Sequence, residues 1–123
     1  MLIVRGLDLH YGNSKILHGV SIEANTGQIT AVMGTNGVGK TSLIKALSGM
    51  HNRTKGDIFL DDEAIGILPS HVLARKGIAV VPQGREIFPL LTVQENLEIG
   101  FSCLPNHNRT IKDEIFELSL IHI

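Results

Sequence analysis

The stretch from residue 34 to residue 41, Gly-Thr-Asn-Gly-Val-Gly-Lys-Thr, constrains the chain more than any other feature. It matches the pattern G-x-x-x-x-G-K-[ST] with Gly34, Gly39, Lys40 and Thr41 at the fixed positions. Glycines let such a loop wrap around a polyphosphate with its backbone N–H groups pointing inward. We therefore expect Lys40 to reach the β- and γ-phosphates of a nucleotide and the Thr41 hydroxyl to bind Mg²⁺.

The sequence around this loop has the order that a phosphate-binding loop requires. Residues 28–33 form an apolar run rich in β-formers, and residues 42–47 have helical spacing. A strand, a loop and a helix in this order place phosphates at the helix N-terminus, where the helix dipole favours anions. The predicted nucleotide contacts from the loop and the first helical turn are Gly34, Asn36, Gly37, Val38, Gly39, Lys40, Thr41 and Ser42.

Length and composition exclude several classes of protein. With 123 residues, 43% of them hydrophobic, and a net charge of −1, the chain is one ordinary domain or part of a larger one. Its basic residues do not cluster with aromatic residues, so we expect no nucleic-acid binding. The single cysteine, Cys103, cannot form an internal disulfide, which agrees with a reducing cytoplasmic setting. No apolar stretch approaches the roughly 20 residues that span a bilayer, so any membrane contact is expected through a partner.

The remaining patterns predict a mixture of strands and helices. Residues 2–9 and 16–23 alternate between apolar and polar side chains, as half-buried strands do. Residues 57–60 predict a short strand, and the apolar run 78–81 predicts a buried parallel strand. Residues 69–76 predict a short helix that ends at a glycine cap.

Two further helices are predicted towards the C-terminus. Thr92 and Glu95 have the spacing of a capping box, so a helix should begin there, run through Ile99 and end at Gly100. Residues 111–118 also have helical spacing. These elements together predict an α/β chain whose first third is β-structure.

A longer match lies at residues 81–97, Val-Pro-Gln-Gly-Arg-Glu-Ile-Phe-Pro-Leu-Leu-Thr-Val-Gln-Glu-Asn-Leu. Together with Tyr11 and the phosphate loop, it resembles the ATP-binding subunits of ABC importers for branched-chain amino acids and urea. It is most similar to the urea subunit, because the amino-acid subunits often carry Glu at the position of Gln83. The resemblance covers residues 1–117 and implies an α/β fold, the P-loop NTPase core of an ABC nucleotide-binding domain. That core would carry an N-terminal antiparallel β-subdomain and be incomplete at the C-terminus.

The resemblance also assigns roles to individual residues. Tyr11 would stack on adenine, since an aromatic face suits a base, and a tyrosine in a hairpin turn is the alternative. Gln83 would be a catalytic residue together with Lys40, and would join Thr41 in holding Mg²⁺, because an amide can switch between partners as a loop moves. The implied cofactors are ATP and Mg²⁺.

The implied partners are membrane-spanning permease subunits and a second ATP-binding subunit, identical or paralogous. ATP binding would close this dimer and hydrolysis would reopen it, driving uptake of urea or branched-chain amino acids from the cytoplasmic face of the membrane. Residues 86–91 would lie near the permease, with Ile87, Phe88 and Leu91 as docking residues, although buried packing of these side chains is an equally good account. The sequence does not name the solute.

Three elements that such ATPases carry are not found in these 123 residues: a Leu-Ser-Gly-Gly-Gln signature, an apolar strand ending in Asp-Glu, and a switch histidine. We therefore expect the printed chain to bind nucleotide at most, without useful hydrolysis. A strand at residues 28–33 would also lack a parallel neighbour, which predicts poor solubility.

The tail at residues 118–123, Leu-Ser-Leu-Ile-His-Ile, corresponds to a reading of a transposon-derived sequencing adapter. Residues 1–117 are then expected to be the native part of the domain and the tail a processing scar. The alternative is an amphipathic helix end.

Two other functions stay open at this stage. Asp61 and Asp62 follow an apolar run, which is the pattern of a Mg²⁺-binding acid in simpler P-loop kinases, but acids at a hairpin turn are usually just solvated. A nucleotide-binding module without hydrolysis is the second. The six histidines show no ligand spacing, so no metal site built from protein side chains is expected.

Overall fold

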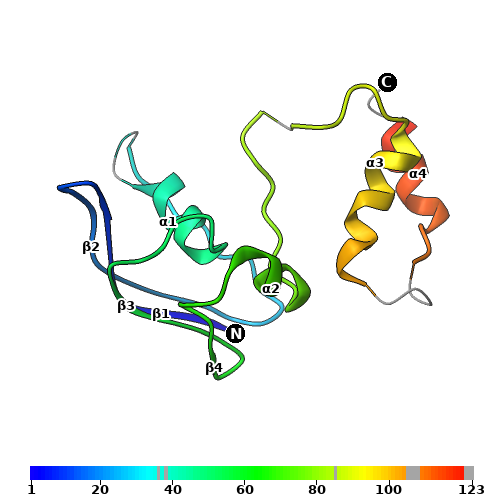
Figure 1. Ribbon diagram of the computed structural model, residues 1–123. Coiled ribbons are helices and arrows are strands. Elements are labelled where there is room, and N and C mark those ends of the chain that lie inside the picture. Colours follow the sequence, from blue (N-terminus) through cyan, green and yellow to red (C-terminus); the bar gives the residue numbers. More distant parts are fainter. Residues whose placement is uncertain (36, 38, 85, 105–108, 121–123) are drawn as a thin grey trace. The chain divides into compact units, whose positions relative to one another are not determined.

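A computed structural model describes residues 1–35, 37, 39–84, 86–104 and 109–120 of the chain. They divide into two compact units, Met1–Val80 and Val81–Ile123 (Figure 1). The first unit contains β1 (Leu2–Tyr11), β2 (Ser14–Ala24), α1 (Lys40–Leu47), β3 (Lys55–Leu60), β4 (Glu63–Ala64) and α2 (Ser70–Arg75). The second contains α3 (Val93–Ile99), the 3-10 helix η1 (Gly100–Cys103) and α4 (Asp113–Leu120).

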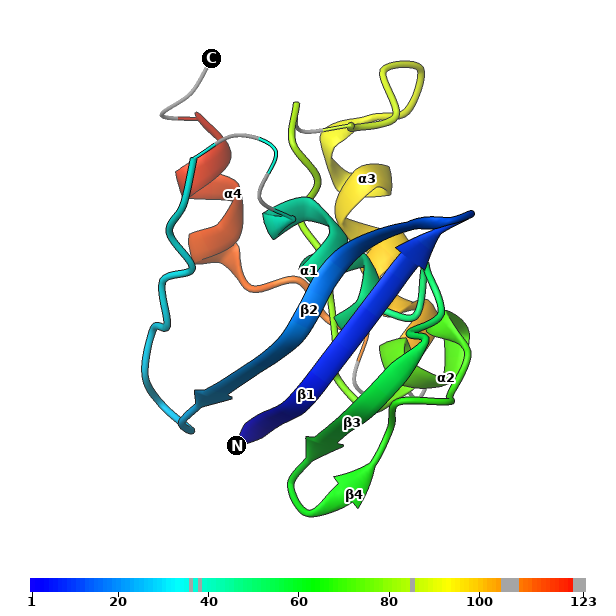
Figure 2. The same ribbon diagram turned by 90° about the vertical axis from the view of Figure 1, so that its left-hand side faces the viewer.

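The first unit is built on an antiparallel sheet of four strands in the order β2-β1-β3-β4 (Figure 2). β1 pairs with β2 from Leu2 opposite Ala24 to Tyr11 opposite Ser14, and its other edge pairs with β3. The predicted strands at residues 2–9 and 16–23 are confirmed, and so is the antiparallel β-subdomain. Both strands run further than expected because the tight turn at residues 12–13 lets pairing continue to the hairpin end.

The core lies between this sheet and the helices α1 and α2, which cover the same face (Figures 1 and 2). β1 contributes Val4, Leu7 and Leu9, whose alternation is broken by an irregularity of the strand between Val4 and Leu7, and α1 adds two side chains three positions apart, which a helix places on one face. The buried apolar side chains are Val4, Leu7, Leu9, Leu17, Leu43, Ala46, Ile58, Ile65 and Leu73.

Asp8 ties β1 to an irregular point of β2. Its Oδ1 accepts a hydrogen bond of 2.6 Å from the backbone N–H of Gly19, and its Oδ2 lies 3.3 Å from Lys15 Nζ. The Gly19 N–H, and after it Lys15 and Lys55, lower the pKa of the Asp8 carboxyl despite some desolvation. The contacts of the folded sheet therefore favour the ionised form of Asp8.

β3 and β4 form a tight hairpin. Leu60 pairs with Glu63, and the two residues between them, Asp61 and Asp62, have φ angles of 47° and 66°. Two left-handed residues are what a two-residue hairpin turn requires, and Asp tolerates that conformation better than most residues. The prediction that these acids sit at a hairpin turn is confirmed.

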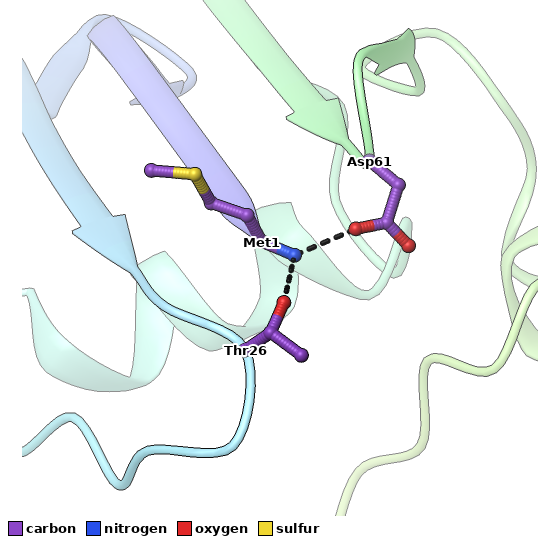
Figure 3. A network of polar contacts seen from close by, with 3 residues as sticks. All are labelled: Met1, Thr26 and Asp61. Carbon is purple, nitrogen blue, oxygen red and sulfur yellow. Dashed lines mark hydrogen bonds and ion pairs between the residues drawn. The ribbon is translucent and has the colours of Figure 1, made fainter.

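The same turn anchors the N-terminus. The Met1 ammonium group donates to Asp61 Oδ1 at 2.6 Å and to Thr26 Oγ1 at 2.9 Å (Figure 3). Asp61 thus already has a structural partner, which joins the start of β1 to the β3–β4 turn.

Two predicted strands are wrong. Within the described residues, neither 28–33 nor 78–81 forms a strand, and the side chains of Ile29, Met33 and Val81 are 100%, 89% and 91% exposed. A strand needs backbone hydrogen bonds to a neighbour, and the only sheet among the described residues is made by β1 to β4. Both runs have the apolar composition of buried strands, but no described segment pairs with either of them.

The predicted helices are confirmed with small shifts at their ends. α2 covers Ser70–Arg75, and Gly77 follows it with a φ angle of 99°. At α3, Glu95 N–H donates to Thr92 Oγ1 at 3.1 Å and Thr92 N–H to Glu95 Oε1 at 3.3 Å, so the capping box is present. α4 continues through Leu120, and residues 121–123 lie outside the described part.

Candidate nucleotide-binding site

The phosphate loop ends directly at the start of α1, whose first residue is Lys40. Asn36 and Val38 lie outside the described residues. Gly37 and Gly39 have φ angles of 86° and 102°, in the region that side-chain-bearing residues rarely adopt. The glycines at these two positions are therefore required by the backbone path of the loop.

Gly39 is constrained by packing as well. A Cβ atom there would lie 2.8 Å from Leu17 Cδ2 and 3.4 Å from the carbonyl oxygen of Ile16. Both neighbours belong to β2, so the end of the loop presses against the antiparallel sheet. The sheet thereby fixes where α1 begins.

Lys40 closes the loop from within. Its ammonium group donates to the carbonyl oxygen of Gly34, joining the two ends of the loop. The first backbone hydrogen bond of α1 runs from Leu43 N–H to Gly39 O at 2.9 Å, so the preceding N–H groups have no partner inside the helix. The first turn of α1 has no acidic residue, and Thr41 is exposed on it. Free N–H groups and the positive end of the dipole are the general features by which a helix N-terminus attracts an anion.

Tyr11 lies beside the same helix. Ser42 Oγ, in the first turn of α1, donates to the Tyr11 hydroxyl at 3.4 Å. Tyr11 is also the last residue of β1, opposite Ser14 at the hairpin end. The hairpin-end position is confirmed, stacking on adenine stays a prediction, and Tyr11 is 39% exposed.

His51 is a neighbour that the sequence did not predict. Its ring centroid lies 4.4 Å from that of Tyr11, with the planes inclined at 46°. No spacing rule links residues 11 and 51, because they meet only through the pairing of strands and the position of α1. We find no signal in the sequence that points to this contact.

No alternative Mg²⁺ site is formed by acidic residues. Among residues 1–35, 37, 39–84, 86–104 and 109–120, no group of three or more His, Cys, Asp or Glu side chains could hold a metal ion. β3, which carries Asp61 and Asp62 at its end, pairs antiparallel with β1 and does not run parallel beside a loop strand. In the part of the chain that the structure describes, Asp61 and Asp62 are therefore not arranged as a P-loop kinase would require.

Gln83 belongs to the second unit, where it is an exposed residue of a turn. The segment that follows it exposes apolar side chains: Ile87 is 68% exposed, Phe88 54% and Leu90 98%. Leu91 is 38% exposed. The alternative account of Ile87, Phe88 and Leu91, in which these side chains are buried by packing, is therefore wrong for the structure described.

Asn96 fixes this segment to α3, which the sequence did not predict. Its Oδ1 accepts from Phe88 N–H at 2.9 Å, and its Nδ2 lies 3.0 Å from Phe88 O and 2.9 Å from Thr92 O. The signal available in the sequence was an Asn one position after the glutamate of a capping box.

None of the helices in the described part of the chain is long and apolar enough to cross a bilayer.

The family model for the ABC transporter matches residues 17–123 of this chain. The chain belongs to the ABC transporter family. Its phosphate loop, Tyr11 and the 81–97 segment are therefore parts of an ABC ATP-binding domain, as the resemblance implied.

Curated ABC relatives differ in what they carry. The chain is 42% identical over 119 residues to the high-affinity branched-chain amino acid transport ATP-binding protein BraG of Pseudomonas aeruginosa, covering 96% of this chain and 51% of BraG. It is 35% identical over 128 residues to the lipopolysaccharide export system ATP-binding protein LptB of Haemophilus influenzae, covering 100% and 53%. For the spermidine/putrescine import ATP-binding protein PotA of Legionella pneumophila (strain Paris) the identity is 32% over 124 residues, covering 100% and 33%. The chain spans about half the length of BraG and LptB and about a third of PotA.

Solved ABC structures agree on the fold. The ATP-binding cassette MJ1267 matches with a TM-score of 0.76 and 28% identity, over 99% of this chain and 55% of that one. A dimeric cassette, MJ0796 bound to ADP and Pi, matches with a TM-score of 0.73 and 21% identity, over 99% and 55%. The chain therefore has the fold of an ABC ATPase cassette with an N-terminal antiparallel sheet.

Proposed function

We propose that this chain is the nucleotide-contacting part of the ATP-binding subunit of an ABC importer. The observation that carries the proposal is the start of α1, where Lys40, the exposed Thr41 and N–H groups with no partner inside the helix share a first turn that has no acidic residue. A tyrosine with an exposed ring lies next to that end, joined to it through Ser42. Phosphates suit the first group and a base suits the second, so the set fits ATP as a whole.

Each of the candidate residues has a proposed role in binding the nucleotide. Lys40 exchanges the Gly34 carbonyl for phosphate oxygens, while the N–H groups of the loop and of the first turn donate to the same phosphates. Thr41 offers its hydroxyl to Mg²⁺, which neutralises phosphate charge when bound. Following the resemblance of residues 81–97, Gln83 is proposed as a further Mg²⁺ and water contact and as a catalytic residue.

The proposed subunit works as a dimer, with itself or a paralogue, docked through the exposed apolar segment 86–91 on membrane-spanning permease subunits at the cytoplasmic face of the membrane. Hydrolysis by the whole assembly drives import. The name of BraG and its 42% identity favour branched-chain amino acids as the solute, and the segment around Gln83 favours urea. The 123-residue chain by itself is proposed to bind nucleotide without useful hydrolysis, since its sequence holds no signature motif or Asp-Glu strand.

Calorimetric titration with Mg-ATP tests the binding step. Replacing Lys40 by Ala removes a charge-assisted contact, so the Kd should rise by about tenfold or more. Lys45→Ala is the matched control, because Lys45 is an exposed lysine in the last turn of the same helix. Equal effects of the two substitutions would refute the proposed role of the loop.

Uptake assays test the solute. Cells lacking the gene should lose uptake of labelled leucine if the subunit serves branched-chain amino acids, and of labelled urea if it serves urea. Loss of neither would refute both assignments.

A further inference from the structure

The ring of His51 packs against the residue expected to hold the base. The centroids of His51 and Tyr11 are 4.4 Å apart, just below the separation of about 4.5–7 Å that is usual for attracting aromatic rings. His51 is half-buried, and its Nε2 lies 3.0 Å from the backbone carbonyl oxygen of His10. Because a carbonyl only accepts, Nε2 carries the hydrogen and donates it.

The two side chains that contact Tyr11 come from α1 and from the segment that directly follows it. Ser42, in the first turn of α1, holds the Tyr11 hydroxyl. His51 follows the other end of α1, and its backbone N–H donates to Lys45 O at 3.2 Å, which fixes the connection to the helix. The hydroxyl of Tyr11 is thus contacted from the start of α1, and its ring from the segment that follows the end of α1.

The backbone beside Tyr11 is held too. His10 precedes Tyr11 in β1, and its carbonyl is the group that His51 binds. The His10 ring lies 2.9 Å, from Nδ1 to Oγ1, from Thr54, which comes just before β3. His51 therefore contacts the Tyr11 ring in a tilted arrangement and also holds, by a hydrogen bond, the backbone of the residue before it.

We propose that His51 is a positioning residue that holds the Tyr11 ring in place for the adenine base. The proposal rests on the proposed nucleotide site. A ring that is 39% exposed at a hairpin end would otherwise sample several orientations and lose that freedom on binding. A ring that His51 already holds loses less, so His51 contributes to affinity for the base and not to affinity for the phosphates.

The test compares two ligands, Mg-ATP and Mg-tripolyphosphate, by calorimetric titration of the protein. His51→Ala should raise the Kd for ATP about threefold to tenfold, the range that an aromatic pair contributes. The Kd for tripolyphosphate, which has no base, should stay unchanged. His51→Phe keeps a ring and should recover most of the ATP affinity. His71→Ala, at an exposed histidine of α2, should change neither value.

Each other outcome has a definite meaning. An unchanged or tighter ATP Kd in His51→Ala overturns the proposal, and so does an equal loss for tripolyphosphate, which would indicate general damage to α1. If circular dichroism shows that His51→Ala is unfolded, His51→Leu replaces it, because Leu keeps bulk without a ring; equal ATP affinity of the Leu and Phe variants then overturns the proposal. If the unaltered protein binds neither ligand, the proposed nucleotide site itself is wrong.

Discussion

Substituting alanine at two glycines of the phosphate loop separates two reasons why glycine is needed there. Gly37 has a φ angle of 86°, and a Cβ atom at this position would meet nothing within 4 Å. Gly39 has a φ angle of 102°, and its Cβ would lie 2.8 Å from Leu17 Cδ2. Gly37→Ala therefore measures backbone strain alone, whereas Gly39→Ala measures strain together with a steric contact.

The magnitudes follow from these geometries. A left-handed backbone costs a residue with a Cβ about 1–2 kcal/mol, so the free energy of unfolding should fall by that amount in Gly37→Ala. Overpacking adds about 1–3 kcal/mol, which makes Gly39→Ala the more damaging change. Leu17 is only 3% exposed and lies in the core, so it has little room to move away.

Urea unfolding followed by circular dichroism gives the free energies, and a double-mutant cycle isolates the contact. Leu17→Ala destabilises on its own by about 2–5 kcal/mol because it empties part of the core. Combined with Gly39→Ala it should cost less than the sum, by about 0.5–3 kcal/mol, since the clashing atom is gone. The same pair made with Gly37→Ala should be additive. Equal stability of the two alanine variants, or additivity in both cycles, would refute the packing argument.

Four further predictions rest on polar contacts within the two units. Asp61→Asn removes only an exposed ion pair, so it should lower stability by less than about 1 kcal/mol and leave the Kd for Mg-ATP unchanged in calorimetry; loss of binding would restore the kinase interpretation. The pKa of Asp8 is lowered in the folded sheet. Its contribution to stability is therefore complete above the ordinary Asp pKa of about 4, and it is lost as the pH falls through the pKa that Asp8 has in the folded protein. Acid unfolding should therefore be less steep in Asp8→Asn, and an identical pH profile would contradict this. Thr92→Ala removes the capping box and should lower the free energy of unfolding by about 1 kcal/mol. Asn96→Ala should speed hydrogen exchange at the amide of Phe88, and unchanged exchange would contradict the role of Asn96 in fixing this segment.

What the sequence could predict was structure set within a few residues. The capping box at Thr92 and Glu95 joins groups three positions apart, so its hydrogen bonds form whenever the chain turns into a helix there. The acids at Asp61 and Asp62 form a turn for a similarly local reason. The phosphate loop is the same case, because the φ angles at Gly37 and Gly39 are accessible only to residues of that type.

The tertiary structure decided what depends on distant segments meeting. The apolar runs at 28–33 and 78–81 have the composition of strands, yet a strand is completed by a neighbour's backbone, and composition cannot supply one. In the candidate site, too, the sequence identified single residues and the tertiary structure decided which of them meet. The sequence named Lys40 and Tyr11 as separate candidates, but only strand pairing and the packing of α1 bring Tyr11 to Ser42 and His51. Contacts across 31 and 40 positions leave no periodic trace in a sequence, because chain distance and spatial distance are unrelated at that range.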